Sequence, residues 1–275
     1  MNFITKKIEK IKSKKSLHEY GWEVKQFNLH PYGLVEYAQW MHPYEHPKII
    51  DNDSVLFCQQ FIKKGDLVID IGAHTGDTAL PMALCAGSEG IVLALEPNRY
   101  VYKILEQNSK LNKALTNIKP LNFAATDTEG TFTFNYSDAS FCNGGFFQRI
   151  KNQKHGHKHT LEVEGKNLEK YLLANYAEQL PKLSFIKVDA EGFDKEILKS
   201  IYTIIKTYKP TIVSECNKHL IDEERFELFD ILHSIGYSLK MTDNFQSLNN
   251  TAIEKKEDML LWKHFDFIAS PEEKH

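Results

Sequence analysis

From about residue 55 to residue 240, short apolar runs alternate with segments whose apolar residues recur at helical spacing. The run LVIDI at 67–71 is apolar except for Asp70, which is the pattern of a strand buried on both faces. We predict strands at 67–71, 91–95, 117–125, 131–136, 160–165, 183–189, 211–215, 236–241 and 259–268, and helices at 53–62, 98–112, 167–177, 192–207 and 222–235, with one more that ends near Ala86. This alternation predicts a parallel sheet with helices on both faces, and the final strands suit an antiparallel edge.

The first 50 residues follow a different pattern. Residues 1–17 carry six lysines and one glutamate, with Ile4, Ile8 and Ile11 at helical spacing. We expect a solvated basic helix docked by these isoleucines, and the alternative is a helix that binds a membrane surface or a partner. Residues 18–50 are rich in aromatic residues, histidine and proline, and no regular period predicts an element there. We therefore divide the chain into a helical and irregular extension at 1–50, which is either a substrate lid or a packed segment, and a catalytic domain at 51–275.

The composition is that of an ordinary globular protein, since 42% of the 275 residues are hydrophobic and 26% are charged. The net charge of −3 argues against a nucleic-acid partner, and no apolar run reaches the roughly 18–20 residues of a membrane span. The basic N-terminus lacks the apolar core of a secretory signal, and the four cysteines show no CxxC spacing. We expect a cytoplasmic protein with no integral membrane segment, as a monomer or a homo-oligomer. Only three of the 34 basic residues are arginine, so few guanidinium groups are present to bind phosphate.

A glycine-rich turn follows the first strand of the predicted sheet, in VIDIGAHTGDTALPMA. A strand that leads into such a turn and a helix brings backbone N–H groups close to a ligand. The spacing is GxxxG, with His74 where a dinucleotide-binding GxGxxG turn has its second glycine, which argues against NAD. Glu96 ends the next strand and can accept hydrogen bonds from both ribose hydroxyls of an adenosine. The pattern suits S-adenosylmethionine, whose charged amino-acid end can be held by Asp70 and the turn backbone. Gly72 and Gly76 are expected here because a side chain at either position would block the ligand.

At these residues the sequence resembles the FkbM-type S-adenosylmethionine-dependent methyltransferases. The resemblance covers about residues 53–216 and rests on five motifs in order: KKGDLVIDIGAHTGDT, ALEPNRYVYKILEQNSKLN, NFAATDTEG, FIKVDAEGFDKEIL and KPTIVSECN. It implies a class I methyltransferase fold, a Rossmann-like α/β architecture with a seven-stranded mixed sheet and helices on both faces. It also implies that the turn binds the methionine end, that Glu96 holds the ribose, and that the strand end at 122–124 borders the adenine. The cofactor-binding residues that follow are Asp70, Gly72, Ala73, His74, Gly76, Thr78, Glu96, Asn122 and Ala124.

Acidic side chains lie at the ends of two consecutive predicted strands, where Asp189 follows LSFIKV and Glu215 ends TIVSE. Ligands bind at this edge of open α/β sheets. Methyl transfer to oxygen requires removal of the hydroxyl proton, by a general base or with a metal that acidifies the hydroxyl. One hypothesis makes Asp189 the general base, with Glu215 as a second catalytic candidate. Another has Asp189, Glu215 and Asn217 bind Mg²⁺ or Mn²⁺. The structural alternative has Glu191 cap its helix, while Glu215 and Asn217 form loop hydrogen bonds.

Three other segments raise hypotheses about the site. The histidines of HGHKH at 155–159 either lie in a surface loop or belong to a substrate loop that presents a base. His42 and His46 either line the substrate pocket or are surface and packing residues. The loop at 140–147 is either a mobile lid that excludes water or a wide hairpin turn.

These observations predict an O-methyltransferase whose acceptor is a sugar hydroxyl, on a nucleotide-activated sugar or on a glycan of a surface polysaccharide such as a capsule. Members of the family generally methylate oxygen, and the aromatic segment 18–50 suits stacking against sugar faces. The alternatives are a lipid or polyketide hydroxyl, an NAD(P)-dependent oxidoreductase on a similar sheet, and a non-catalytic protein with a degenerate methyltransferase fold. The GxxxG spacing and the absence of a Tyr-x-x-x-Lys pair near the expected strands oppose the oxidoreductase. The presence of Asp70, Glu96 and Asp189 opposes the non-catalytic protein.

Overall fold

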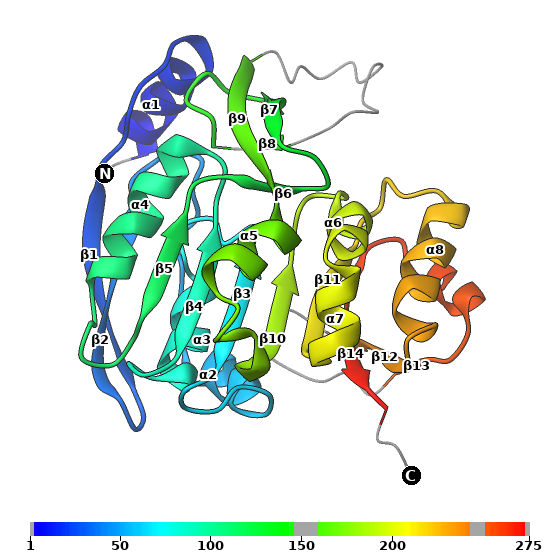
Figure 1. The fold of residues 1–275 in the computed structure, drawn as a ribbon. Helices are drawn as coiled ribbons and strands as arrows, with labels where there is room; N and C mark the ends of the chain where they lie inside the picture. Colours follow the sequence, from blue (N-terminus) through cyan, green and yellow to red (C-terminus); the bar gives the residue numbers. More distant parts are fainter. Residues whose placement is uncertain (1–2, 143, 146–158, 243–250, 273–275) are drawn as a thin grey trace.

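A mixed sheet of eight strands runs through the centre of the computed structural model, which describes residues 3–142, 144–145, 159–242 and 251–272 (Figure 1). The strand order is β13-β12-β14-β11-β10-β3-β4-β5. The strands are β3 (Leu67–Ile71), β4 (Ile91–Leu95), β5 (Ile118–Leu121), β10 (Leu183–Val188), β11 (Thr211–Cys216), β12 (Tyr237–Thr242), β13 (Ala252–Ile253) and β14 (Phe265–Pro271). Strands β5, β4, β3, β10 and β11 are parallel, and β14 inserts antiparallel between β11 and β12. This is the class I methyltransferase sheet that we expected, extended by the two-residue strand β13.

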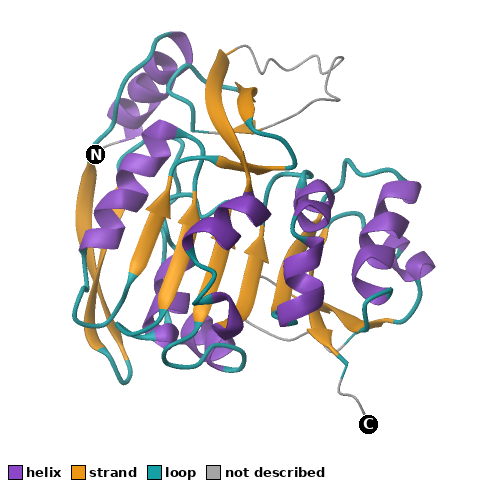
Figure 2. Ribbon diagram, in the orientation of Figure 1, coloured by secondary structure: helices purple, strands orange, loops and turns teal. Residues whose placement is uncertain are grey.

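Helices cover both faces of this sheet, as Figure 2 shows. The helices of the described residues are α1 (Phe3–Lys15), α2 (Asn52–Gln59), α3 (Ala79–Ala86), α4 (Arg99–Lys110), α5 (Leu168–Asn175), α6 (Asp194–Ser200), α7 (Tyr202–Tyr208) and α8 (Asp222–His233), with 3-10 turns η1 (Leu180–Lys182) and η2 (Lys256–Leu260). Of these, α1 lies apart from the central sheet, next to the second sheet described below (Figure 1). Successive residues of β3 enter opposite cores: Leu67 and Ile69 pack with α5–α8, whereas Val68 packs with α2 and α3. A strand buried on both faces must be apolar on both, which explains the uninterrupted run LVIDI.

A second sheet lies beyond the carboxyl ends of the central strands (Figure 1). It has the order β6-β9-β7-β8 and consists of β6 (Ala124–Thr126), β7 (Gly130–Tyr136), β8 (Gly144–Gly145) and β9 (His159–Asn167). The single strand that we expected at 117–125 is therefore two strands, since β5 belongs to the central sheet and β6 to the second. The alternating apolar residues of β7 and β9 build a small core of their own.

The N-terminal extension contains a β-hairpin where we expected irregular structure. Its strands β1 (Trp22–Leu29) and β2 (Gly33–Trp40) pair antiparallel along their whole length. The alternation typical of a strand is hidden because β2 is buried on both faces at its end: Tyr37 joins the core around α2 and α3, and Ala38 packs near α4. The hairpin thus shares cores with the rest of the chain, and the division at residue 50 stays a prediction.

Three smaller differences from the expected elements have local causes. The helix expected at 192–207 is broken at Ile201, whose backbone leaves the helical region, and so forms α6 and α7. The strand expected at 259–268 starts only at Phe265, because η2 occupies the preceding residues. In α1, Ile8 and Ile11 are about half exposed, so the expected docking through isoleucines is not seen at these two positions. None of the helices in the described segments is long and apolar enough to span a bilayer.

Candidate active site

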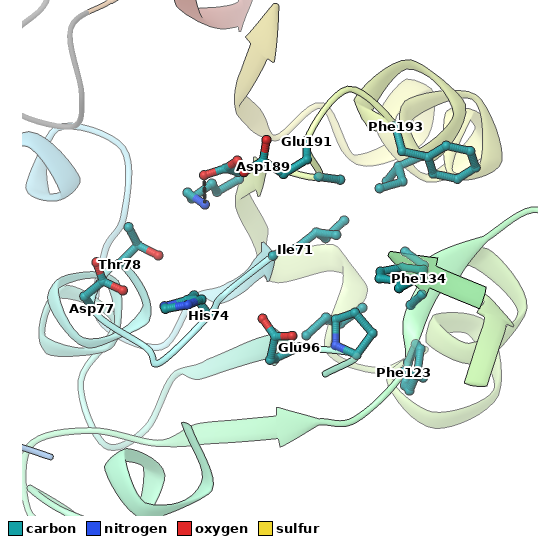
Figure 3. A pocket seen from close by; sticks show the side chains of 18 of the residues that line it. Ile71, His74, Asp77, Thr78, Glu96, Phe123, Phe134, Asp189, Glu191 and Phe193 are labelled. Carbon is teal, nitrogen blue, oxygen red and sulfur yellow. Dashed lines mark hydrogen bonds and ion pairs between the residues drawn. The ribbon is translucent and has the colours of Figure 1, made fainter. Parts of the chain in front are cut away.

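A cavity of about 470 Å³ lies at the carboxyl ends of β3, β4 and β10 and is closed on one side by the second sheet (Figure 3). Figure 3 shows Glu96 between His74 on one side and the rings of Phe123 and Phe134 on the other, with Asp189 across the cavity. Of the predicted site residues, the structure brings six to the cavity wall: Gly72, His74, Thr78, Glu96, Ala124 and Asp189. The others lie outside it: Asp70, Ala73, Gly76, Asn122, Glu215 and Asn217.

The turn after β3 has the positive φ values that its glycines predict, and packing inside the protein adds a reason for them. Gly72 and Gly76 have φ values of +79° and +92°. A Cβ atom on Gly72 would lie 1.9 Å from the carbonyl oxygen of Asp189, and one on Gly76 would lie 2.9 Å from Leu105 Cδ1. Positive φ therefore favours glycine at both positions, and at Gly72 the backbone of Asp189 leaves no room for a Cβ atom. That a side chain at either position would also block the ligand stays a prediction. His74 also has a positive φ of 48°, which makes it part of the turn geometry.

This contact predicts a large difference between two glycines with the same positive φ. Gly33 in the hairpin turn shares the φ of +79° but has no atom within 4 Å of its would-be Cβ. We expect Gly72→Ala to lower the free energy of unfolding by about 2–3 kcal/mol more than Gly33→Ala, because only the first adds a clash to the backbone strain. Urea denaturation of both variants measures the difference. Equal losses would show that β3 and β10 can separate at Gly72 without cost.

Glu96 ends β4 as a buried carboxylate on the cavity wall. Burial raises its pKa to about 7, although backbone hydrogen bonds from Asn98 and His74 act in the opposite direction. The Asn98 amide donates to Glu96 Oε1 at 2.7 Å, while the Asn98 side chain caps α4 by accepting from the Tyr100 amide. Asn122 donates to the backbone carbonyls of Glu96 and Pro97, so it holds this strand end and does not itself border the cavity. A buried, rigidly held carboxylate of this kind suits a pair of neighbouring hydroxyls.

Lys187 is a site residue that the sequence reasoning missed. It lies beside Asp70 in the register of β10 and β3, with its Nζ 3.6 Å from Asp70 Oδ1 and 3.2 Å from Asp189 Oδ2. Burial opposes its charge, but Asp189 and Asp70 outweigh this and raise its pKa above the ordinary value. Asp70 Oδ2 accepts from Thr78 Oγ1 at 2.8 Å, and its fully buried Oδ1 has no hydrogen bond among the described residues. The available signal was a lysine inside the apolar run LSFIKVD.

Asp189 and Glu215 occupy different environments. The Asp189 side chain is 49% exposed and lines the cavity. Glu215 is buried away from it, accepting a hydrogen bond from Asn217 Nδ2 at 2.8 Å, with His264 Nε2 at 3.4 Å. Burial raises the pKa of Glu215, and the hydrogen bond from Asn217 opposes this. These contacts favour a structural role for Glu215 and Asn217. Within the described ranges, no three His, Cys, Asp or Glu side chains are grouped so that they could hold a metal ion.

The other predicted segments reach the cavity in part. His46 lines it, whereas His42 is buried with Nε2 3.5 Å from Asp138 Oδ1. Cys142 lines it as well, next to Phe141, whose ring stacks on Tyr100. Residues 143 and 146–147 of the expected lid and 155–158 of HGHKH lie outside the described residues, and residue 159 opens β9.

Comparison with known proteins shows which proteins this chain is similar to. Curated relatives include methyltransferase sdnD of Sordaria araneosa, which is 24% identical over 58% of this chain and 73% of its own. Another is the hexuronic acid methyltransferase AglP of Haloferax volcanii, 24% identical over 59% of this chain and 61% of its own, so this chain spans less than two thirds of that relative.

Solved structures with a similar course of the chain include the methyltransferase FkbM of Methylobacillus flagellatus KT. It has a TM-score of 0.46 and 12% identity, covering 79% of this chain and 51% of that one. An S-adenosylmethionine-dependent O-methyltransferase of Thermotoga maritima has a TM-score of 0.44 and 12% identity, covering 93% and 79%. The methyltransferase FkbM domain matches residues 70–239, which contain the end of β3, β4, β10 and the cavity wall except for Tyr44, Glu45, His46 and Lys48. Because this match spans more than half of the 275 residues, the chain belongs to the FkbM family of S-adenosylmethionine-dependent methyltransferases.

Proposed function

We propose that this methyltransferase transfers the methyl group to a hydroxyl oxygen of a sugar. The observation that carries the proposal is the position of Asp189, a half-exposed carboxylate on the cavity wall, across from Glu96 (Figure 3). An alcohol needs a base to accept its proton as it attacks carbon, and a carboxylate within reach of the reacting oxygen is suited to that role. Acidic and polar side chains around Asp189, among them Asp77 and Glu191, offer acceptors for the further hydroxyls of a sugar.

The residues present fit S-adenosylmethionine. Glu96 would hold the ribose hydroxyls, and Phe123, Ala124 and Phe134 would enclose the adenine on the side of the second sheet. The sulfonium of the bound cofactor supplies an electrophilic methyl group. The chain's own part is to orient the acceptor, accept its proton at the Asp189 carboxylate, and exclude water with the aromatic side chains of β7. Lys187 would hold the Asp189 carboxylate in place through the 3.2 Å ion pair.

The charges of the site favour a glycan over a nucleotide sugar as the acceptor. A second cavity of about 220 Å³ shares Asp189 and Lys187 with the first and adds Asp266, whose pKa burial raises to about 6. Both lysines that line the cavities already pair with carboxylates, Lys48 with Asp77 at 3.0 Å. Arg225 is buried and donates to backbone carbonyls. Among the described residues, therefore, each lysine that lines a cavity already has a carboxylate partner, which disfavours an acceptor that carries a diphosphate.

The relatives support the same acceptor class without identifying it. One of them is named for a hexuronic acid, which is a sugar, and the name of the other states no acceptor. A lipid or polyketide hydroxyl is the second candidate, because the family resemblance includes such acceptors. Against it, the open part of the cavity around Asp189 is lined by charged side chains. Membership in a methyltransferase family sets aside the oxidoreductase and the non-catalytic protein.

A methyl-transfer assay tests the proposal directly. Labelled S-adenosylmethionine is supplied with a panel of oligosaccharides, nucleotide sugars, and lipid and polyketide alcohols, each with and without EDTA. We expect label on the oligosaccharides and undiminished transfer in EDTA, since the described acidic residues form no metal-binding group. Transfer only to the lipid or polyketide alcohols would overturn the proposal. Activity lost in EDTA and restored by Mg²⁺ or Mn²⁺ would favour the hypothesis that Asp189 binds a metal ion.

The raised pKa of Glu96 predicts a pH-dependent cofactor affinity. Ribose hydroxyls donate hydrogen bonds to the ionised carboxylate, so binding favours the form that is lost as the pH falls below about 7. We expect S-adenosylhomocysteine to bind about tenfold more weakly at pH 6 than at pH 8, the ratio of the ionised fractions of a group with that pKa. Calorimetry from pH 6 to 8 measures this. In Glu96→Gln the affinity is expected to be lower and independent of pH, and an unchanged slope in that variant would assign the titration to another group.

A further inference from the structure

The N-terminal hairpin is hydrogen-bonded to the turn between β3 and α3, residues 72–78, which we call the cofactor turn. Tyr37 on β2 shares a 2.6 Å hydrogen bond with Thr75 Oγ1 in the turn. The Asn108 side chain joins both parts, accepting from the Ala38 amide at 2.6 Å and donating to the Thr75 carbonyl at 2.8 Å. All of these groups are buried. The hairpin is therefore held against the turn by a buried network whose polar groups are hydrogen-bonded, which makes this contact a fixed part of the fold.

The chain that follows this hairpin places an ion pair on the cavity wall. Glu45 and Lys48 both line the cavity, beside His74 and Asp77 of the cofactor turn. The Glu45 side chain is only 7% exposed, and its Oε1 has no hydrogen-bond partner among the described residues. Its nearest cation is Lys48 Nζ at 3.6 Å, beyond hydrogen-bond distance. His74 Nε2 lies 3.9 Å from Oε2, but burial lowers the pKa of His74 and so favours its neutral form. Glu45 is thus a buried carboxylate that still needs a donor.

The shape of the cavity decides which ligand group reaches this wall. Figure 3 shows the rings of Phe123 and Phe134 on one side of Glu96, and His74 and Asp77 on the opposite side. A nucleoside whose base lies among the rings and whose ribose meets Glu96 directs its 5′ substituent away from the rings. Two regions lie there: the half-exposed Asp189, open to an incoming acceptor, and the enclosed wall that holds Glu45. A cofactor end that does not react suits the enclosed region.

We propose that Glu45 and Lys48 of the N-terminal extension bind the amino-acid end of the cofactor, with the ammonium group at Glu45 and the carboxylate at Lys48. Glu45 supplies an anion and Lys48 a cation on this wall. Lys48 also pairs with Asp77 at 3.0 Å, but its ammonium group has three N–H donors and can bind a ligand carboxylate as well, so the two side chains match a zwitterion. The extension is then part of the cofactor site, whereas the sequence left two alternatives open, a substrate lid and a packed segment. The proposal rests on the use of S-adenosylmethionine and is independent of the acceptor.

Two thioethers that differ only in the amino-acid end test the assignment. S-adenosylhomocysteine carries it, and methylthioadenosine ends in a methyl group. We expect Glu45→Gln and Lys48→Met each to weaken S-adenosylhomocysteine about tenfold or more by calorimetry, because each removes a charged hydrogen-bond partner. Methylthioadenosine should bind all variants within about twofold of the parent protein. Equal losses of affinity for both ligands, or no loss for either, would overturn the proposal. A rise only in the KM of the acceptor would show that Glu45 and Lys48 bind the acceptor instead.

A matched control and a third ligand exclude a purely structural effect. Glu23 and Lys25 form an exposed ion pair on the preceding hairpin, with 2.9 Å between Oε2 and Nζ, so Glu23→Gln and Lys25→Met should change no affinity. Decarboxylated S-adenosylhomocysteine keeps the ammonium group alone. Glu45→Gln should weaken it, and Lys48→Met should not. The reverse pattern would overturn the pairing of groups. If Glu45→Gln melts below the temperature of the assay, Glu45→Asp, which keeps the charge on a shorter side chain, is measured with the same three ligands.

Discussion

Replacing Lys187 with methionine is expected to lower the free energy of unfolding by about 3–5 kcal/mol, the cost of removing one partner from a buried ion pair. Methionine keeps most of the volume of the side chain, so the loss is mainly electrostatic. Asp70 is fully buried, and the cation facing its Oδ1 is Lys187. Burial raises the pKa of Asp70, and Lys187 is the strongest opposing influence. Without that cation the carboxylate must either ionise unpaired in the core or bind a proton.

The sign of the pH dependence follows from the raised pKa of the buried Asp70 carboxyl. A carboxyl group whose pKa is raised by folding costs stability as the pH rises through the folded-state value, because the unfolded chain ionises more easily. The deficit of Lys187→Met should therefore be smallest in mild acid and grow toward neutral pH. Urea denaturation at several pH values measures it. Adding Asp70→Asn to the Lys187→Met protein should recover part of the loss and flatten the pH dependence, and a double variant less stable than Lys187→Met would contradict the account.

The part of the site that sequence reasoning reached depends on periodicity. Strands buried on both faces are continuous apolar runs, so LVIDI and LSFIKVD placed Asp70 and Asp189 at one edge of the sheet. The same logic placed Glu96 at the end of β4. Parallel pairing of neighbouring strands then brings these positions together without knowledge of any side-chain contact.

Other parts of the site depend on contacts that no period encodes. Position 72 has no room for a Cβ atom because the carbonyl oxygen of Asp189, 117 positions later in the sequence, lies next to it. These two residues are close only because β3 and β10 pair. The hairpin was missed because the end of β2 is buried on both sides, which erases the alternation by which half-buried strands are recognised. Glu45 and Lys48 lie in a segment without regular structure, so their position on the cavity wall follows from the hairpin that precedes them.

Asp189→Asn is expected to lower kcat by about 10²–10⁴, the usual contribution of a positioned general base. Asparagine keeps the shape of the side chain but cannot accept a proton, and Lys187 keeps Asp70 as its second partner at 3.6 Å, so the fold and the affinity for S-adenosylhomocysteine should change little. Initial rates at saturating S-adenosylmethionine, measured with a sugar found in the acceptor panel, give the effect.

Glu215→Gln provides the matched control, because it removes a carboxylate at the same edge of the sheet that does not border the cavity. The hydrogen bond from Asn217 Nδ2 can still be accepted by the glutamine carbonyl oxygen, so near-normal turnover is expected. A large loss of kcat in Glu215→Gln together with normal turnover in Asp189→Asn would assign the role of general base to Glu215. The acceptor would then have to bind near Glu215. Large losses in both, each restored in part by added Mg²⁺ or Mn²⁺, would instead indicate that the two carboxylates act through a shared ion, for which Asn217 is a further candidate ligand.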